Sequence, residues 1–394
     1  MASALRLSPV EMLRRLVAFD TTSAKSNLAL IEWVRDYLAG HGIDSHLVPN
    51  TEGTKANLFA TIGPASDGGI VLSGHTDVVP VTGQAWDTDP WKLTEKNGAL
   101  FGRGSCDMKG FIALALAMAP DFAAATLRRP VHYCLSYDEE VGCIGVPSLV
   151  AKLARELPKP ALAIIGEPTE MRVVNAHKGI CGFRTTVTGL EAHSSRIPYA
   201  VSAIFHAVDI IGFIQKLAEE YRKAPRLDIF DPPYVTFNVG EIVGGTAVNI
   251  VPKQCSFVWE FRPIPGVDPD RVIAQVQGFI EREVVPKIKA AYPDGGVSTD
   301  TFAKTPAFAP DPNSPAEALA RRLTGANQST TVAFGTEAAV FQQYGIPAIV
   351  CGPGSIAQAH QPNEFIALEQ VDKGQEFMRK LFAWVTSDEA KTLP

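Results

Sequence analysis

Apolar positions in the first part of the chain alternate between the spacing of helices and that of strands. Residues 8–11 (Ser-Pro-Val-Glu) form a helix start, because serine can cap, proline suits the first turn and the glutamate completes a capping box. A second amphipathic helix is predicted over residues 27–39. The apolar runs 56–62 and 70–72 then predict strands. This alternation is typical of an α/β domain.

The same alternation continues further along the chain. Apolar runs at 131–137, 161–165 and 347–350 predict further strands, and residues 111–119 predict a helix. Each predicted strand is followed by side chains that bind metals or transfer protons, and one more lies in a glycine-rich loop: His75, Glu139, Glu140, Glu167 and His360, with Asp107 in the loop. Groups just past the carboxyl ends of strands line the crevice where α/β proteins bind ligands.

Each of these residues also has a plain structural interpretation. A histidine at a strand end is often only hydrogen-bonded, Asp107 suits the N-cap of the following helix, and successive carboxylates are usually surface charge. Asp77 could cap a turn, but it also lies close enough to His75 to accept the second ring N–H, as the partner of a metal-binding histidine does. The repetition of the pattern favours a shared site.

The middle of the chain has a different order of predicted strands and helices. Strands are predicted at 183–188, 235–239 and 257–261, with amphipathic helices at 201–218 and 269–285. This run predicts an inserted α+β domain with a four-stranded sheet and two helices. We therefore expect a catalytic metal-binding domain of residues 1–180 and 293–394 and an inserted domain of residues 181–292.

Length, net charge and cysteine content limit the possible partners and location of the protein. The chain of 394 residues is longer than one core supports, and its net charge of −6 argues against nucleic acid as a partner. We find no apolar stretch of membrane-spanning length and no signal-peptide pattern, so no membrane association is expected. The six cysteines form no CxxC pair, which indicates reduced thiols and a cytoplasmic location.

The glycine-rich segment 102–110 permits a second interpretation, as a dinucleotide-binding loop. Its details argue against this, because the last glycine of the motif is replaced and no strand leads directly into the segment. The acidic residue expected about twenty positions later is also missing. Asp107 in this loop is better explained as a ligand.

Two histidines with several carboxylates and no cysteine form an oxygen and nitrogen donor set. Such a set suits Zn²⁺, with Co²⁺ or Mn²⁺ as possible substitutes. One carboxylate can bridge two ions, as in hydrolytic two-metal sites. Of the adjacent Glu139 and Glu140, one can bind metal while the other stays free as a general base. The pattern thus favours a metal-dependent hydrolase.

Several segments resemble the M20 family of dinuclear zinc amidohydrolases and peptidases. The resemblance extends from about residue 8 to 385 and is carried by segments 73–80, 102–110, 138–142, 166–169, 176–179, 192–195, 335–337 and 352–364, which includes His360. It implies a zinc-exopeptidase-like α/β catalytic domain with an inserted ferredoxin-like α+β domain for dimerisation and as a lid. It also implies a homodimer that hydrolyses small N-acyl amino acids.

The resemblance implies a role for each candidate residue. His75, Asp107 and Glu167 would hold one zinc ion, and Asp107, Glu140 and His360 the second ion of the same subunit. Glu139 would be the general base, and Asp77 would orient His75. The alternative of another class is a catalytically inactive amino-acid-binding homologue, against which the intact ligand set and Glu139 stand.

The inserted domain also receives roles from the resemblance. His193 would reach into the active site of the partner subunit and stabilise the oxyanion, and Asn249 and Arg262 would bind the carboxylate side of the substrate. A guanidinium suits this task because it grips a carboxylate with two parallel hydrogen bonds. Glu337 and Ser355 either line the substrate pocket or only support loops.

Overall fold

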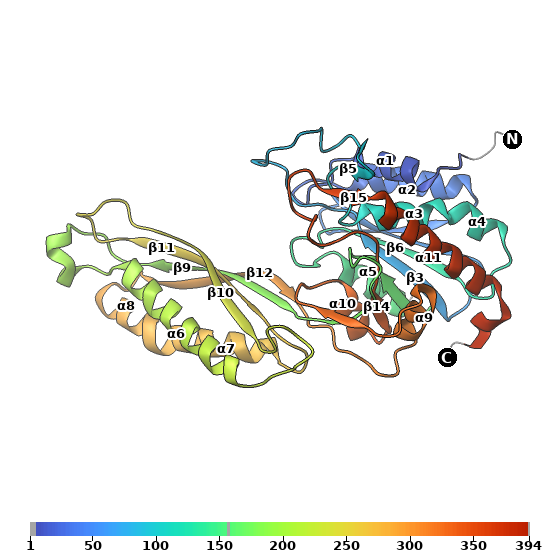
Figure 1. The fold of residues 1–394 in the computed structure, drawn as a ribbon. Coiled ribbons are helices and arrows are strands. Elements are labelled where there is room, and N and C mark those ends of the chain that lie inside the picture. Colours follow the sequence, from blue (N-terminus) through green and yellow to red (C-terminus); the bar gives the residue numbers. More distant parts are fainter. Residues whose placement is uncertain (1–4, 156–157, 393–394) are drawn as a thin grey trace. The chain divides into compact units, whose positions relative to one another are not determined.

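The computed structural model describes residues 5–155 and 158–392 and divides into two compact units (Figure 1). The first, here called the discontinuous unit, comprises the chain up to Ala176, Pro310–Thr330 and the chain from Thr336 onward. The second, the inserted unit, comprises His177–Ala309 with Thr331–Gly335. The fold is α/β, with a mixed sheet in the first unit and a separate antiparallel sheet in the second.

The discontinuous unit is built on an eight-stranded sheet. Its strands, in order across the sheet, are β1 (Ser45–Pro49), β2 (Ala56–Ile62), β6 (Val131–Ser136), β3 (Gly69–His75), β7 (Pro160–Ile165), β14 (Ala348–Val350), β8 (Val174–His177) and β13 (Thr330–Val332). The central strands β6, β3, β7 and β14 are parallel, whereas β1, β2 and β8 pair in the antiparallel sense. The central strands are almost entirely buried, which explains their continuous apolar runs.

Helices from both ends of the chain pack on this sheet. They are α1 (Pro9–Val17), α2 (Leu28–Gly40), α3 (Lys109–Ala117), α4 (Ala119–Ala124), α5 (Val146–Arg155), α9 (Pro315–Thr324), α10 (Ala338–Gln343), α11 (Leu368–Thr386) and the short η3 (Asp388–Thr392). The predicted start of α1 is confirmed, since Ser8 and Glu11 form a reciprocal capping box. A small sheet of β15 (Phe365–Ala367), β5 (Ala99–Phe101) and β4 (Thr94–Lys96) completes the unit.

The inserted unit is a four-stranded antiparallel sheet with helices on one face (Figure 1). The strand order is β10 (Thr236–Gly244), β11 (Gln254–Arg262), β9 (Ile180–Thr188) and β12 (Gly296–Thr305). The helices are η1 (Ser194–Tyr199), α6 (Ala203–Lys223), α7 (Pro269–Phe279), the π-helical turn η2 (Ile280–Val284) and α8 (Val285–Ala291). Alternate residues of β11 are buried, and Trp259 stacks on Phe183 of β9 with ring centroids 4.4 Å apart. The chain order and sheet order together are those of a ferredoxin-like fold.

Two of the differences from the sequence-based boundaries concern the candidate site and the inserted unit. β3 continues through Ser73 and Gly74 to His75, because His75 still pairs with Ser136 of β6. The inserted unit extends beyond residue 292, since β12 pairs along the whole of β9. β12 consists mainly of polar residues, so the apolar pattern gives no sign of it. Among the described residues, no helix has the length and hydropathy needed to cross a membrane.

Candidate metal centre

The sheet order explains why the predicted ligands meet. His75 ends β3, Glu139 and Glu140 follow β6, Glu167 follows β7, and His360 lies on the loop that follows β14. These four strands are neighbours and parallel, so their carboxyl ends lie at one edge of the sheet. The turn after β7 requires a glycine, because a Cβ on Gly166 would lie 1.9 Å from the ring of Phe111.

Asp107 lies between the two histidines. Its Oδ1 is 3.1 Å from Nε2 of His75, and its Oδ2 is 3.4 Å from Nε2 of His360. The same ring nitrogen of His360 is 2.9 Å from Oε2 of Glu140. One carboxylate thus offers one oxygen to each side, which is the arrangement that a ligand shared by two cations requires.

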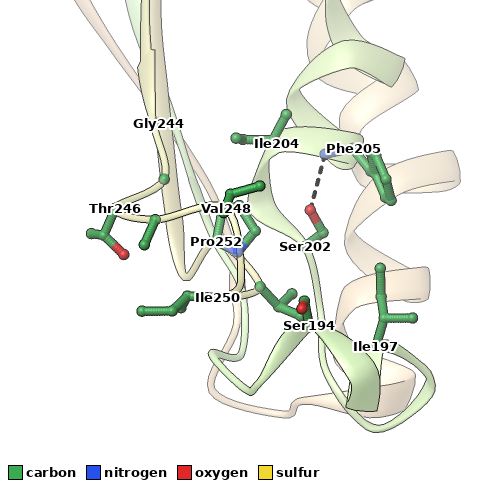
Figure 2. A pocket seen from close by; sticks show the side chains of 13 residues that line it. Ser194, Ile197, Ser202, Ile204, Phe205, Gly244, Thr246, Val248, Ile250 and Pro252 are labelled. Atoms are coloured by element: carbon green, nitrogen blue, oxygen red, sulfur yellow. Dashed lines mark hydrogen bonds between the residues drawn. The ribbon is translucent and has the colours of Figure 1, made fainter.

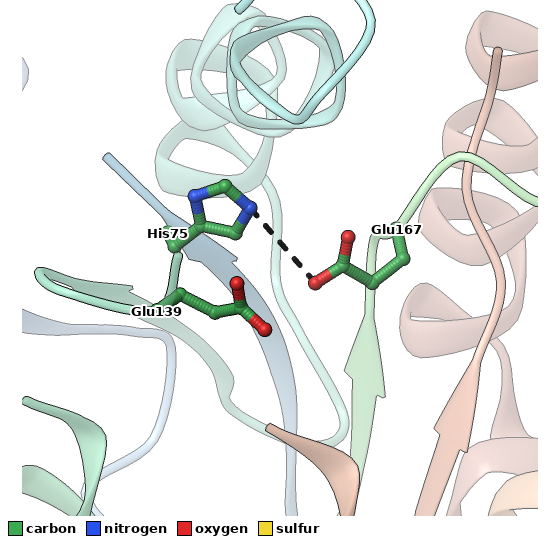
Figure 3. Close-up of side chains that lie close together, drawn as sticks. All are labelled: His75, Glu139 and Glu167. Carbon is green, nitrogen blue, oxygen red and sulfur yellow. Dashed lines mark ion pairs between the residues drawn. The ribbon is translucent and has the colours of Figure 1, made fainter. Parts of the chain in front are cut away.

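Glu139 and Glu167 complete the cluster beside His75 (Figure 3). Nε2 of His75 is 3.9 Å from Oε1 of Glu167. Two sets of three residues each offer one ligand atom within 4.8 Å of the others: His75, Glu139 and Glu167, and His75, Asp107 and Glu140. The structure therefore brings all five predicted ligands and the predicted base to one place.

The electrostatics of the cluster test whether it suits a cation. Burial raises the pKa of Glu139 and of Glu167 well above the usual value, and raises that of Glu140 to about 7. Burial acts in the same direction on Asp107, but hydrogen bonds with the two imidazoles outweigh it and lower the pKa of that carboxyl. Oε1 of Glu167 is buried and has no hydrogen-bond partner among the described residues. An oxygen-rich, buried donor set with an unpaired oxygen fits divalent cations.

Asp77 supports the cluster differently from the prediction. Nδ1 of His75 contacts the backbone carbonyl of Asp77 at 2.9 Å, whereas the Asp77 carboxylate is 3.6 Å from that nitrogen. The carboxylate instead accepts the backbone N–H groups of Glu139 at 3.1 Å and Glu140 at 3.3 Å. Asp77 therefore ties the turn after β6 to the end of β3. Ser23, to which sequence reasoning assigned no role, donates to the same carboxylate at 2.7 Å.

Glu337 and Ser355 have contacts that support loops. Glu337 is only 1% exposed and accepts hydrogen bonds from the hydroxyl groups of Ser73 and Ser136 beneath the strand ends. The backbone carbonyl of Ser355 accepts from the thiol of Cys106 at 3.4 Å, next to Asp107. These contacts favour the supporting role over direct contact with a substrate.

The inserted unit holds the other three predicted residues. His193 and Asn249 lie together, and Arg262 lies far from them. His193 is exposed and contacts the Ser195 hydroxyl at 2.9 Å. Asn249 lies beside it, since its carbonyl accepts the N–H of Ser194. Arg262 lies at the far end of β11 from that loop and forms an ion pair with Glu260 at 3.1 Å. At about 3.3 Å per residue, this strand spans roughly 25 Å.

The fold and the strand-end cluster are those of an M20-type hydrolase with a candidate metal site. The chain belongs to peptidase family M20/M25/M40, whose family model matches residues 71–383. It is 37% identical over 383 residues to the acetylornithine deacetylase of Myxococcus xanthus, covering 94% of this chain and 96% of that protein. It is 33% identical over 381 residues to the acetylornithine deacetylase of Pasteurella multocida (strain Pm70), covering 94% and 96%.

The fold is shared with solved structures. An M20 family metallo-carboxypeptidase of Sulfolobus solfataricus superposes with a TM-score of 0.75 at 18% identity, and the match covers 95% of this chain and 98% of that chain. The likeness confirms the predicted fold class of a mixed α/β unit with a separate inserted sheet. The family assignment made from the sequence motifs is likewise confirmed.

Proposed function

We propose that this protein removes the acetyl group from N2-acetyl-L-ornithine, releasing L-ornithine and acetate in arginine synthesis. One observation carries the hydrolytic part, namely the convergence of His75 and His360 on Asp107 with Glu139 beside them. The acyl substrate is supported by the near full-length similarity to two proteins named acetylornithine deacetylase. All six cysteines are buried, and none forms a disulfide bond within the described part of the chain, which supports the cytoplasm as the location.

The residues of the cluster divide between binding and proton transfer. We assign His75, Asp107 and Glu167 to one Zn²⁺ and Asp107, Glu140 and His360 to a second, with Co²⁺ or Mn²⁺ as substitutes. When bound, such ions polarise a carbonyl group and lower the pKa of water. The donor set supports this assignment because it contains two imidazoles, three carboxylates and no thiolate.

Glu139 is assigned the proton transfers. Its backbone is fixed by Asp77, and its Oε1 accepts the thiol of Cys143 at 3.3 Å. As the water oxygen adds to the acetyl carbon, Glu139 accepts the water proton at a carboxylate oxygen. It then donates that proton to the amide nitrogen as the C–N bond breaks, so that the amine leaves neutral.

The separation of the inserted-unit residues supports a homodimer. One copy of the inserted unit cannot place His193, Asn249 and Arg262 at one centre, because β11 lies between them. In a dimer with a twofold axis, each centre can receive Arg262 from one copy of the inserted unit and His193 with Asn249 from the other copy. In this arrangement, His193 stabilises the oxyanion in the partner's site, and Arg262 and Asn249 both bind the carboxylate side of the substrate.

The surface of the inserted unit also supports pairing with a second copy. β10 is an edge strand, and Ile242 and Val243 on it are exposed, as are Phe205 and Val208 on α6. A hollow of about 500 Å³ lies next to Phe205, between the start of α6 and the loop that carries the fully exposed Val248. Figure 2 shows the side chains that line it. An open edge flanked by apolar side chains is a template for association.

Substrate profiling tests the proposal. We expect the purified protein with Zn²⁺ to hydrolyse N2-acetyl-L-ornithine with a higher kcat/KM than N-succinyl-diaminopimelate, other N-acyl amino acids or dipeptides. Equal or faster turnover of the succinyl compound would instead make the protein a succinyl-diaminopimelate desuccinylase. A preference for the last two substrates would indicate a broad deacylase or a carboxypeptidase. No hydrolysis of any of them, with metal bound, would indicate an amino-acid-binding homologue.

A further inference from the structure

Two of the proposed ligands, Asp107 and His360, come from loops that no helix or strand fixes directly. Asp107 precedes α3 in the glycine-rich loop, and His360 lies between β14 and β15. The His360 backbone has a φ of 62°, in the left-handed region that a histidine adopts only when its surroundings hold it there. Its side chain is 51% exposed, so packing alone holds the imidazole weakly.

Glu364 fixes the loop of Asp107. Its Oε1 accepts the backbone N–H groups of Asp107 at 3.0 Å and Cys106 at 2.9 Å. Its Oε2 accepts the N–H of Gly104 at 2.9 Å and the guanidinium of Arg103 at 2.7 Å. Glu364 and Arg103 are each 1% exposed, so this carboxylate is fully committed to the loop.

Arg103 and Gln84 extend these contacts to His360. The second terminal nitrogen of Arg103 donates to Oε1 of Gln84 at 2.6 Å. Nε2 of Gln84 then donates to the backbone carbonyl of His360 at 2.9 Å. The guanidinium of Arg103 also lies over the ring of Trp86, 5.2 Å from its centroid. A continuous chain of hydrogen bonds thus joins the backbone of Asp107 to that of His360.

We propose that Gln84, Arg103 and Glu364 form a positioning relay that sets the distance between Asp107 and His360 and so tunes binding of the second divalent cation. The relay rests on the proposed metal centre. It differs from an ordinary buried ion pair because its far end is the carbonyl of a proposed ligand. None of the three residues contacts the cation or the substrate in this account; they act through the two ligands.

Gln84 gives the cleanest test, because it is only partly buried and carries no charge. Gln84→Met keeps the length of the side chain and removes its polar atoms. We expect one of the two stepwise Zn²⁺ dissociation constants to weaken by about tenfold or more, as is typical when a partner of a metal ligand is removed. The other constant should change less than about threefold on the same grounds. Competition with a chromophoric chelator measures both constants.

Gln375→Met is the matched control, since Gln375 on α11 has a similar exposure and lies beside Met378 in a surface hollow. It should leave both dissociation constants unchanged. The metal-free melting temperature should be somewhat lower in Gln84→Met than in Gln375→Met, because Arg103 loses an acceptor. The rise in melting temperature on adding Zn²⁺ should also be smaller in Gln84→Met. A merely structural role for Gln84 predicts only the first effect, with an unchanged rise and unchanged zinc binding.

The outcomes separate this proposal from the one on which it rests. If the wild-type protein does not bind two Zn²⁺ ions, the metal centre itself is wrong. If it binds two and Gln84→Met binds both with unchanged constants, the relay is wrong and the metal centre stands. Glu364→Gln, which breaks the ionic contact with Arg103, should weaken zinc binding more than Gln84→Met; an equal or smaller effect in a folded variant also overturns the relay.

Discussion

The two units of this protein treat their functional side chains in opposite ways. In the discontinuous unit, His75 and Glu167 at strand ends and Asp107 in the loop before α3 are buried and lie within a few ångströms of one another. In the inserted unit, His193 and Asn249 are exposed on loops, and Arg262 lies at the other end of a strand. The discontinuous unit thus gathers its candidate residues into one cluster, whereas the inserted unit holds its candidate residues apart.

The contrast has a physical cause. Parallel neighbouring strands deliver their carboxyl ends to one edge, so residues far apart in sequence meet without long loops. Burying several carboxylates together is unfavourable unless a positive charge compensates, so such a cluster indicates a cation. An antiparallel sheet sends successive strand ends to opposite edges, so a single copy does not gather its residues. A second copy can.

The largest expected effect is in the discontinuous unit. Glu139→Ala should lower kcat for N2-acetyl-L-ornithine by about 10³-fold, because it removes the group that carries the proton in both directions. Zinc content should stay near that of the wild type, since the proposed ligands remain. Steady-state kinetics and metal analysis of the same preparation measure the two quantities.

Glu95→Ala, in an exposed position on β4, is the control and should be without effect on either quantity. Retained activity in Glu139→Ala would remove Glu139 from the base role. A loss of zinc together with activity would instead make Glu139 a ligand, as the grouping of His75, Glu139 and Glu167 permits.

The next effect tests the inserted unit. His193→Ala should lower kcat by about 10²-fold, the typical loss when one oxyanion donor is removed. If His193 acts on the partner's site, a mixed dimer of Glu139→Ala and His193→Ala subunits contains one centre with both residues intact. Activity should therefore return when the two inactive variants are co-expressed with different affinity tags and purified as the mixed dimer.

A mixed dimer as inactive as its parents would place His193 in its own subunit's site or outside any site. A purely monomeric protein with full activity would remove the second copy from the mechanism altogether. Size-exclusion chromatography with light scattering distinguishes these cases. Either result would mean that the inserted unit does not act on the site of a second copy.

In the discontinuous unit, the candidate ligands could be predicted from the sequence more readily than the residues that hold their loops in place. The proposed ligands other than Asp107 could be located because each follows an apolar run, and the strands 56–62 and 161–165 match β2 and β7 closely. The carboxylate contacts of Asp77 and Glu364 could not, because both bind backbone N–H groups, and backbone partners leave no trace in residue type. β12 was missed for a related reason, since sheet pairing alone holds its polar residues.

The smallest expected effect compares two buried histidines on neighbouring strands, His75 on β3 and His132 on β6. Burial disfavours the charge on both. At His75 the adjacent carboxylates overcome it and raise the pKa well above the usual value. His132 contacts the Thr61 hydroxyl at 3.0 Å and the stacked ring of Phe59, and burial lowers its pKa to about 4. Carboxylate neighbours therefore decide the sign of the shift.

The lowered pKa of His132 predicts acid sensitivity. The unfolded chain takes up this proton below about pH 6.5, whereas the folded protein does so only near pH 4, so stability is full above pH 6.5 and falls as the pH decreases. Between pH 7.5 and 5.0 this amounts to about 2 kcal/mol, which for a chain of this length is a shift of about 2 °C in melting temperature. In metal-free protein, His132→Gln should reduce the fall in melting temperature over that interval by this amount, whereas His46→Gln, on the exposed side of β1, should not. An equal fall in wild type and His132→Gln would mean that His132 is charged in the fold, and the contrast with His75 would then fail.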